Sequence, residues 1–537
     1  MDSESDFLGG TVQRLFGLSY LFPYQRLVIT NMLEAAEAAG ISLRRSCDPG
    51  GSDESPLPSQ EQVPWAESEV SGTAAGGETD RACLGRQIVI LPTGAGKSLC
   101  FQLPAMILEG PTLVIYPILS LMADQERRLR ERGFFPVTLR GGQSREERDL
   151  LWEQIRSGKS RFIIANPEVL LTSAVMEKLN GLGIVHAVID EAHCVSEWGE
   201  SFRPAYLRIG EIIAALYGNG PEPLITAFTA TASAPVLEKI ERYIFGSRGA
   251  HRIIGSPDRS NISYAAQGCI LRDLAVRDLI LKHKRPAIVF CSSRRGTEKL
   301  ARRLRNDLGK TGAGEFSETE IRFYHAGLDR EEKTGVERWF FGNPRGVLVS
   351  TCAYGMGVDK PDIRTVIHRD CPPSVEAYLQ ESGRAGRDGL PSRAILLWGS
   401  NDAGILARRG TGPDRQRMEQ ILSYARNTGR CRRETLLALL DYEGSGGSPG
   451  GDCCDVCSGT AGETLREEAS LTDFFRRNRR IYTLKEAAAV LARTGTVGWT
   501  EDEARLAVLE LIRNKRIRKM RNFLWKDKLT TAKSFEQ

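Results

Sequence analysis

Two segments of the chain carry residue types that bind and cleave a nucleoside triphosphate. The first is Leu91-Pro-Thr-Gly-Ala-Gly-Lys-Ser98, which follows an apolar run and precedes a helical stretch at 99–108. Backbone N–H groups of such a loop can surround a triphosphate, with Lys97 on the β- and γ-phosphates and Ser98 on a magnesium ion. The residues predicted to bind ATP here are Thr93, Gly94, Ala95, Gly96, Lys97 and Ser98.

The second segment is an acidic pair, Asp190 and Glu191, at the end of a later apolar run. A strand that ends in two acids can place Asp190 on the magnesium ion and Glu191 on the attacking water, and phosphoryl transfer requires both positions. A solvated turn is the alternative for such a pair, and the upstream phosphate loop favours catalysis. His193, two residues later, is predicted to be a third catalytic residue.

A pair of arginines lies far downstream, in Gln380-Glu-Ser-Gly-Arg-Ala-Gly-Arg387. Arg384 and Arg387 are three positions apart and can neutralise a γ-phosphate from across a cleft, as an arginine finger and its partner. A spaced arginine pair more often forms surface ion pairs, but this half of the chain has no phosphate loop of its own. A site divided in this way predicts that hydrolysis drives relative motion of two lobes.

The elements that must position these residues are short apolar strands alternating with helical segments. Near-continuous β-branched runs of this kind are typical of parallel sheets covered on both faces, so the fold class is α/β with two tandem lobes. The first series of strands is expected at 87–91, 112–116, 161–165, 187–190 and 224–228. The second is expected at 287–291, 346–350, 365–368 and 394–398.

The predicted domains are a first lobe at 1–245, a second lobe at 246–400, a helical cysteine-bearing subdomain at 401–460 and a basic domain at 461–537. Residues 44–83 interrupt the first lobe and are rich in Gly, Ser, Pro, Glu and Ala. A segment with so few aliphatic residues cannot bury enough surface to become ordered, which predicts a flexible loop.

Charge is concentrated at the C-terminal end of the chain. The net charge is +5, and residues 461–537 hold 17 Lys+Arg against 11 Asp+Glu, with clusters at 476–480 and 513–521. A basic domain beside a nearly neutral body favours a nucleic-acid partner, although a solvated helix face would explain either cluster alone. Helical spacing at 471–491 and 500–514, followed by an alternating stretch at 516–529, suits a winged helix.

Four of the twelve cysteines lie close together in the sequence: Cys431, Cys453, Cys454 and Cys457. Clustered thiols in a reducing compartment predict a metal site sooner than disulfides, and tetrahedral zinc needs four such ligands. The adjacent Cys453 and Cys454 can share one ion only if the backbone turns sharply between them, so Cys453 is the least secure ligand.

No stretch of about eighteen apolar residues occurs, which predicts no membrane span. The acidic start of the sequence, with no apolar core behind it, does not read as a secretory signal. The expected location is the cytoplasm (the bacterial nucleoid) or a nucleus.

The order of these motifs resembles that in superfamily-two helicases. Their individual residues resemble those of RecQ DNA helicases over roughly residues 10–460. The most specific part is Asp190-Glu-Ala-His-Cys-Val-Ser-Glu-Trp-Gly-Glu-Ser-Phe-Arg-Pro-Ala-Tyr206, which is similar to the acidic motif and aromatic-rich loop of that family. The other segments that carry the resemblance are 228–232, 258–261, 353–361, 380–387 and the helical run that begins at Cys431-Arg-Arg.

The resemblance implies two RecA-like lobes, a zinc-binding subdomain, a winged-helix-like domain and an ATP-dependent 3′-to-5′ DNA helicase of repair or recombination. Single-stranded DNA would be sensed by Trp198, Phe202 and Arg203, since aromatic faces stack on any base. Further implied positions are Ser120, Asn166 and Arg521 on single-stranded or forked DNA, and Gly357 and Asp359 on the nucleotide. The hairpin near 521–525 would touch the duplex fork, although a basic partner-binding or stability domain is the alternative.

The chain departs from this family at two places. Gln25 is present for the adenine, but Phe22 replaces an arginine and Leu18 stands where an aromatic residue is expected, so Tyr20, Phe22 or Tyr24 would stack on the base. The trailing cysteines read Cys453-Cys454-x-x-Cys457, with Gly451 where the family has its first cysteine.

Two other functions compete with a DNA helicase. An RNA helicase or a double-strand translocase would use the same ATP-hydrolysing residues. The aromatic-rich loop and the cysteines argue against both of these functions. A nucleic-acid binder with a degenerate motor would not need the intact set of Lys97, Asp190, Glu191, Arg384 and Arg387.

Overall fold

The computed structural model describes most of the chain and divides it into two compact units. The described residues are 4–44, 83–92, 94–197, 204–218, 220–309, 320–355, 360–399, 402, 406, 412–440, 442, 453–461, 466–494, 499–513, 515–521 and 523–532. One unit is built mainly on Met1–Asp258, and the other mainly on Arg259–Gly355, Lys360–Leu439 and Ser445–Gln537.

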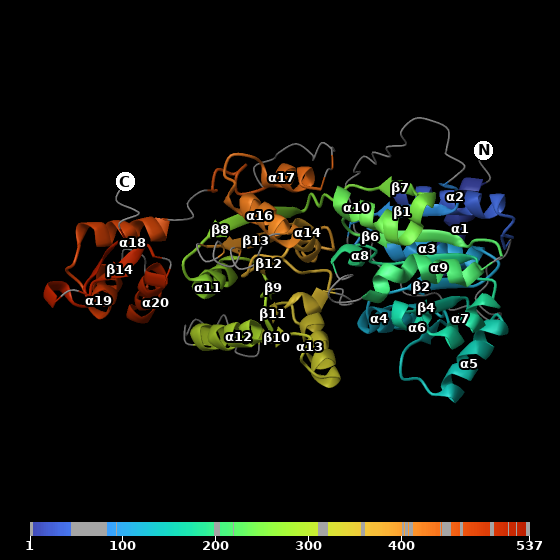
Figure 1. The fold of residues 1–537 in the computed structure, drawn as a ribbon, viewed down its shortest axis with the longest axis horizontal. Coiled ribbons are helices and arrows are strands. Elements are labelled where there is room, and N and C mark those ends of the chain that lie inside the picture. Colours follow the sequence, from blue (N-terminus) through green and yellow to red (C-terminus); the bar gives the residue numbers. More distant parts are fainter. Residues whose placement is uncertain are drawn as a thin grey trace. The chain divides into compact units, whose positions relative to one another are not determined.

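The first unit is built on a seven-stranded sheet with the order β3-β4-β2-β5-β6-β1-β7 (Figure 1). Its strands are β1 (Arg86–Ile90), β2 (Thr112–Ile115), β3 (Val137–Leu139), β4 (Phe162–Ala165), β5 (His186–Ile189), β6 (Leu224–Thr229) and β7 (His251–Ile254). Every pairing between neighbouring strands is parallel. The α/β fold class predicted from the apolar runs is therefore confirmed for this unit.

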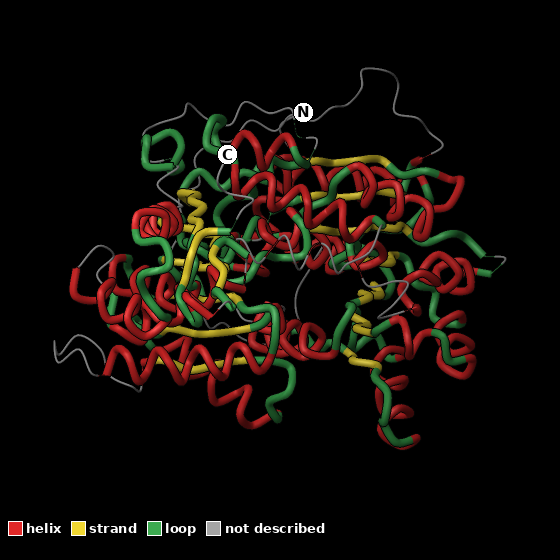
Figure 2. Tube along the Cα trace, turned by 60° about the vertical axis from the view of Figure 1, so that its left-hand side comes forward, coloured by secondary structure: helices red, strands yellow, loops and turns green. Residues whose placement is uncertain are grey.

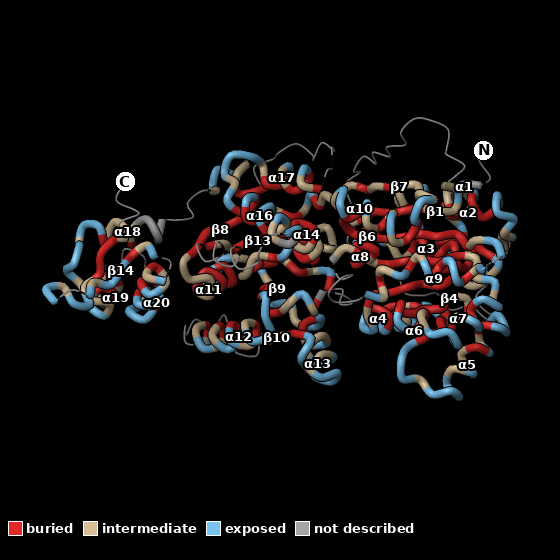
Figure 3. Tube along the Cα trace, viewed as in Figure 1, coloured by how far each residue is buried: buried red, intermediate tan, exposed pale blue. Residues whose placement is uncertain are grey.

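Helices cover both faces of this sheet, so alternate residues of one strand enter different cores. Val89 packs in a core with α1 (Glu4–Phe16), α2 (Pro23–Ala38), α3 (Lys97–Ile107) and α4 (Leu119–Glu131). Its neighbours Ile88 and Ile90 pack in the other core. The helices of that second core are α5 (Arg145–Arg156), α6 (Pro167–Leu170), α7 (Ser173–Asn180), α9 (Ile209–Tyr217) and α10 (Ala234–Ile240). Burial on both faces explains why the inner strands have no polar alternation, and Figure 3 shows the sheet mainly buried, whereas the edge strand β7 is partly exposed.

The first unit extends beyond the boundary expected at residue 245. Residues 251–254 form β7, which pairs with β1 through the register Gln87↔His251 to Ile90↔Ile254. This pairing satisfies the backbone groups of an extra strand at the edge of the first sheet, so the division between the units falls after Asp258.

The second unit contains a six-stranded sheet with the order β10-β11-β9-β12-β13-β8, and every pairing is again parallel. Its strands are β8 (Ile262–Gly268), β9 (Ala287–Phe290), β10 (Ile321–Tyr324), β11 (Val347–Ser350), β12 (Thr365–His368) and β13 (Ser392–Trp398). The helices of this unit include α11 (Arg272–Lys282), α12 (Arg294–Gly309), α13 (Arg330–Gly342), α14 (Val375–Ser382), α16 (Pro413–Arg426) and α17 (Arg432–Ala438). Figure 2 shows the strands flanked by helices.

The C-terminal part of the second unit has its own small core. It contains α18 (Arg466–Arg477), α19 (Leu484–Thr494), α20 (Glu501–Arg513) and an antiparallel hairpin of β14 (Ile517–Lys519) and β15 (Leu529–Thr531). An isolated bridge between Thr483 and Lys528 adds a short third strand position. Three helices followed by this hairpin give the winged-helix-like arrangement predicted from the spacing.

Among the described residues, no helix combines the length and apolar character needed to cross a membrane.

Candidate functional site: a nucleotide-binding edge and a cysteine cluster

Several of the described residues predicted for catalysis and binding in the first unit lie beyond the ends of parallel strands. Because all strands of the first sheet run in one direction, their carboxyl ends share one edge, which is the edge where open α/β sheets bind ligands. The phosphate loop follows β1, the acidic pair follows β5, Ser120 is the second residue of α4, the helix after β2, and Asn166 follows β4. The sheet order puts β6 between the phosphate loop and the acids.

The phosphate loop folds as a tight turn into α3. Gly94 has φ 89° and Gly96 has φ 73°, both in the left-handed region that glycine tolerates best. A Cβ atom on Gly96 would lie 2.5 Å from Nε2 of Gln25, so a side chain at this position would have to displace the Gln25 amide. Lys97 Nζ donates to the carbonyl oxygen of Leu91 at 3.1 Å, and Ser98 is the second residue of α3.

Gln25 fastens α2 to the phosphate loop. Its Oε1 accepts from the N–H of Phe22 at 3.0 Å, and its Nε2 donates to the carbonyl oxygen of Ala95 at 3.0 Å. Tyr24 Oη donates to the same Ala95 oxygen at 3.2 Å, a contact that no sequence motif indicated. Gln25 is buried, with 4% of its surface exposed. Gln25, which is expected to contact the adenine, thus also stabilises the phosphate loop.

Three aromatic rings lie at the start of α2. Phe22 stacks on Tyr24 with ring centroids 5.5 Å apart and planes 5° apart, and Tyr20 meets Phe22 edge-on at 5.8 Å. Tyr20 remains 59% exposed, whereas Leu18 packs against the hydrophobic core. Of the three rings proposed from the sequence to stack on adenine, Tyr20 therefore has a largely free face.

The acidic pair is held in an uncommon backbone conformation. Glu191 has φ 52°, which is rare for a residue with a long side chain and is often found at functional sites. Its N–H donates to Oδ1 of Asp190 at 2.9 Å. The buried Oε2 of Glu191 has no hydrogen-bond partner within the described part of the chain, and lies 3.4 Å from Nδ1 of His193.

His193 connects the acidic segment to the end of β6. Its Nδ1 lies 3.1 Å from Oγ1 of Thr229, and that hydroxyl donates to the carbonyl oxygen of Thr231 at 2.9 Å. His193 itself is buried, with 5% of its surface exposed. The imidazole of His193 therefore links the Glu191 carboxylate to the turn after β6, so a movement of one can affect the other.

The environment of Asp190 disfavours its charge. Burial raises the pKa of Asp190 to about 7, the negative charge of Glu191 acts in the same direction, and the ammonium group of Lys97 opposes them. Such an acid is poised between its two protonation states near neutral pH, as at many functional sites. A magnesium ion, which Asp190 and the hydroxyl of Ser98 would hold, requires the carboxylate form.

Part of the predicted DNA-contacting set is described by the structure. Ser120 is exposed near the start of α4. Asn166 is 8% exposed, precedes α6, and donates from Nδ2 to Oε2 of Glu168 at 2.5 Å. Outside the described residues lie Thr93, Trp198, Phe202, Arg203, Gly357 and Asp359.

In the second unit, the segment with Arg384 and Arg387 follows α14. Arg384 is 3% exposed, and Arg387 is half-buried. Gly386, between them, has φ 54°, and a Cβ atom there would come within 2.7 Å of three other groups. Its N–H donates to the carbonyl oxygen of Ile363 at 2.8 Å. The two arginines therefore sit on a tightly packed turn.

The structure brings the four clustered cysteines together. Their sulfur atoms all lie within 4.8 Å of one another, with Cys431 Sγ 3.6 Å from Cys453 Sγ and 3.9 Å from Cys454 Sγ. Tetrahedral zinc with Zn–S bonds near 2.3 Å separates its sulfurs by about 3.8 Å. The adjacent Cys453 and Cys454 thus both reach the cluster, and the four thiols are compatible with a zinc ion.

Local hydrogen bonds favour thiolate at one of these cysteines. Although burial acts in the opposite direction, the backbone N–H groups of Cys457 and Arg432 lower the pKa of Cys454, and each donates to its Sγ at 3.4 Å. Burial raises the pKa of Cys453 to about 11, against the opposing hydrogen bond from Arg433. A metal ion binds thiolate, so it must displace protons at this cluster.

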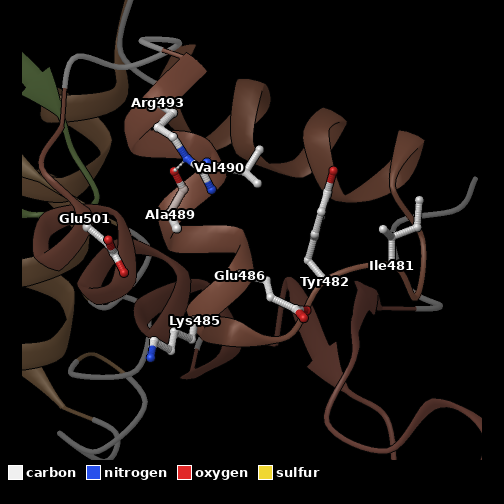
Figure 4. A pocket seen from close by; sticks show the side chains of 8 residues that line it. All are labelled: Ile481, Tyr482, Lys485, Glu486, Ala489, Val490, Arg493 and Glu501. Atoms are coloured by element: carbon white, nitrogen blue, oxygen red, sulfur yellow. Dashed lines mark hydrogen bonds between the residues drawn. The ribbon is translucent and has the colours of Figure 1, made fainter.

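The C-terminal hairpin exposes apolar side chains beside basic ones. Phe523 is 97% exposed and Leu524 is 77% exposed, while Arg480 lies over the ring of Trp525 at 4.6 Å. Arg521 is exposed in the same loop. A pocket elsewhere on this domain has charges of both signs in its lining (Figure 4), which consists of Ile481, Tyr482, Lys485, Glu486, Ala489, Val490, Arg493 and Glu501.

Comparison with known families matches each unit to a motor domain. A model of the DEAD/DEAH box helicase family matches residues 79–240, and a model of the helicase conserved C-terminal domain matches residues 272–389. These two matches define a class, the two-lobed helicases of the DEAD/DEAH box type. A crystal structure of the DUF1998 helicase MrfA bound to DNA and AMPPNP has the same fold, with a TM-score of 0.52 and 19% identity over 75% of this chain and 52% of that one.

Curated relatives narrow the class. The chain is 35% identical to the ATP-dependent DNA helicase RecQ of Haemophilus influenzae over 379 residues, which is 69% of this chain and 58% of the relative. It is 39% identical over 321 residues to the probable ATP-dependent DNA helicase RecS of Bacillus subtilis, covering 59% of this chain and 61% of the relative. The chain belongs to the RecQ family of superfamily-two helicases. It spans less than two thirds of the length of these relatives.

We expect the affinity for magnesium to depend on pH through Asp190. Because burial raises the pKa of this carboxyl to about 7, the protein must release a proton before Asp190 can hold the ion. The dissociation constant for Mg²⁺ in the presence of ATP should rise about tenfold between pH 8 and pH 6, as measured by calorimetry with wild type and Asp190→Asn. An equal pH dependence in both proteins would contradict this assignment.

Proposed function

We propose that this chain is an ATP-dependent DNA helicase that translocates 3′ to 5′ and unwinds duplex DNA in repair or recombination. The observation that carries the proposal is the shared edge of the first sheet, where the phosphate loop, the acidic pair and Asn166 all follow parallel strands. Membership of the RecQ family supports DNA over RNA, since the relatives described above are named as DNA helicases. A DNA substrate implies work in the cytoplasm, at the bacterial nucleoid, or in a nucleus.

The roles in hydrolysis follow from the chemistry of each group. Lys97 would neutralise the β- and γ-phosphates, Asp190 and Ser98 would hold magnesium, and Glu191 would orient and deprotonate the attacking water. The unpartnered Oε2 of Glu191, close to His193, supports this role among the described residues. Magnesium, when bound, supplies neutralisation of the charge that develops on the phosphate oxygens.

From the second unit we assign Arg384 and Arg387 to the same reaction, as groups that stabilise negative charge on the γ-phosphate. Gly357 and Asp359 are assigned to the nucleotide on the family resemblance. Gln25 would read the adenine edge through its remaining amide N–H, with Tyr20 as the exposed ring for stacking.

Coupling to DNA is proposed through Trp198, Phe202 and Arg203, with Ser120 and Asn166 as further contacts. The two last residues follow β2 and β4, neighbouring strands of the first sheet, and so belong to the same edge as the acids. The contacts from Glu191 through His193 to Thr229 would transmit movement of the turn after β6 to the acidic pair.

Zinc is the proposed resident of the cysteine cluster. Sulfur separations of 3.6 Å and 3.9 Å fit a tetrahedral site, and zinc would tie the segment of Cys453, Cys454 and Cys457 to the start of α17 at Cys431.

The helicase proposal predicts that Glu191→Gln abolishes unwinding while ATP still binds. Loss of a positioned base lowers kcat for ATP by at least about a hundredfold. Unwinding of a 3′-tailed DNA duplex, a 5′-tailed one and an RNA duplex should be compared for wild type, Glu191→Gln and the control Glu131→Gln, whose side chain is 58% exposed. Preference for the RNA duplex, or unwinding by Glu191→Gln at the wild-type rate, would refute the proposal.

The zinc proposal predicts one zinc ion per purified chain, measured by elemental analysis. Cys453→Ser should lower the zinc content because it removes one of four thiolate ligands, and the control Cys352→Ser, at an exposed cysteine outside the cluster, should not. Wild-type protein without bound zinc would rule the site out, and full occupancy in Cys453→Ser would remove Cys453 from the ligand set.

The exposed hairpin predicts a role in parting strands. Replacing Phe523 and Leu524 together by alanine should slow unwinding about tenfold, since an apolar wedge that stacks on a base contributes about 1–3 kcal/mol. ATP hydrolysis stimulated by single-stranded DNA should stay within about twofold of wild type. The control is the same double change at Leu506 and Leu509, which are partly exposed on α20 of the same domain; equal slowing in both double variants would contradict the hairpin's role.

A further inference from the structure

A buried arginine next to the cysteine cluster reaches the start of the second sheet. Arg433 lies in the first turn of α17 and is 5% exposed. Its Nε donates to Cys453 Sγ at 3.3 Å, and its Nη1 donates to the carbonyl oxygen of Arg259 at 2.9 Å. Its Nη2 donates to the carbonyl oxygens of Ile262 at 2.7 Å and Ser260 at 3.4 Å. One guanidinium group thus joins a cluster thiol to the backbone of 259–262.

A second buried arginine continues from that backbone to the turn that carries Arg384 and Arg387. Arg259 is 3% exposed. Its Nη1 donates to the carbonyl oxygen of Gly383 at 3.2 Å, and its Nη2 donates to those of Ala385 at 3.3 Å and Gly386 at 2.7 Å. Asn261 adds a donor, with Nδ2 2.8 Å from the carbonyl oxygen of Gly386.

These contacts restrict the turn because its main donor, the guanidinium of Arg259, is buried and charged. A buried guanidinium is tolerated only when its N–H groups have acceptors, so moving the turn would leave Arg259 short of partners at a high free-energy cost. Space is equally restricted at Gly386, where a Cβ atom would lie 2.5 Å from both Asn261 Nδ2 and Ser392 Oγ. Both constraints therefore favour the observed arrangement of the turn.

We propose that Arg433 and Arg259 are positioning residues that couple the cysteine cluster to the arginine turn at 383–387. When the sulfur of Cys453 is fixed in a metal-bound cluster, Arg433 is fixed with it, Arg433 holds the backbone at Arg259, and Arg259 orients the turn. The metal-binding subdomain then does more than stabilise the fold, because its occupancy adjusts the hydrolysis that Arg384 and Arg387 assist. The inference rests on the proposed role of those two arginines.

Arg432 provides a matched control for a general loss of stability. It is adjacent to Arg433, is 0% exposed and also holds the cysteine segment, through an ion pair with Asp455 and a hydrogen bond from Nη1 to the carbonyl oxygen of Tyr424 at 2.9 Å. Among the described residues, its side chain makes no hydrogen bond or ion pair with 259–262 or with the arginine turn. Arg432→Ala should therefore loosen the subdomain without releasing Arg259.

The experiment combines hydrogen exchange with ATPase kinetics on the full chain. In Arg433→Ala, backbone amides of 383–392 should exchange about tenfold faster than in wild type, and kcat for ATP should fall about tenfold with KM little changed. Metal-depleted wild type should show the same faster exchange of 383–392, a readout independent of activity. Arg433→Lys should restore only part of the protection, since an ammonium group lacks the planar fork of the guanidinium.

The outcomes separate the possible failures. Unchanged exchange of 383–392 in Arg433→Ala, or equal effects in Arg432→Ala, would overturn the coupling. Faster exchange with an unchanged kcat would show that the arginine turn does not assist hydrolysis, and would overturn the proposed coupling. Absence of ATPase activity in the wild type would instead refute the proposed function. If Arg433→Ala does not fold, Asn261→Ala removes a single neutral donor to the turn and should raise exchange at 386–390.

Discussion

Parallel pairing of strands is the constraint on which the rest of the molecule depends. In both sheets every neighbour runs in the same direction, so each crossover returns the chain to the same starting edge and all carboxyl ends gather at the other. Residues remote in sequence then share an edge without any direct requirement on their spacing. The phosphate loop and the acidic pair meet in this way, on either side of β6.

Three buried charged side chains have fixed surroundings in the two units. Asp190, Arg259 and Arg433 are each more than nine-tenths buried, and each has a small set of fixed partners. For Asp190 the consequence is a pKa near neutrality, which links its charge to metal binding. For the two arginines the consequence is that the carbonyl groups bonded to them are held in place. If those groups moved, a buried guanidinium would lose its hydrogen bonds.

The cysteine segment is part of the second sheet as well as a metal-binding candidate. Tyr264 of β8 pairs with it as an added parallel bridge, with its N–H donating to the carbonyl oxygen of Cys453 at 3.2 Å. The N–H of Asp455 donates in turn to the carbonyl oxygen of Tyr264 at 3.0 Å. An edge strand that would otherwise present unpaired backbone groups is thus covered, and the cysteine segment is held beside β8, the neighbour of β13.

The sequence by itself determined the fold class, the most apolar strands of both sheets and the residue types of the nucleotide site, because apolar periodicity and the phosphate loop are local signals. The short or weakly apolar strands β3, β7, β8 and β10 were not among those expected, since tertiary pairing stabilises them. Only the tertiary structure decided that adjacent cysteines share one cluster. It alone joined Gln25 to Ala95 and Arg433 to Arg259, because hydrogen bonds between residues so far apart in the chain leave no local pattern.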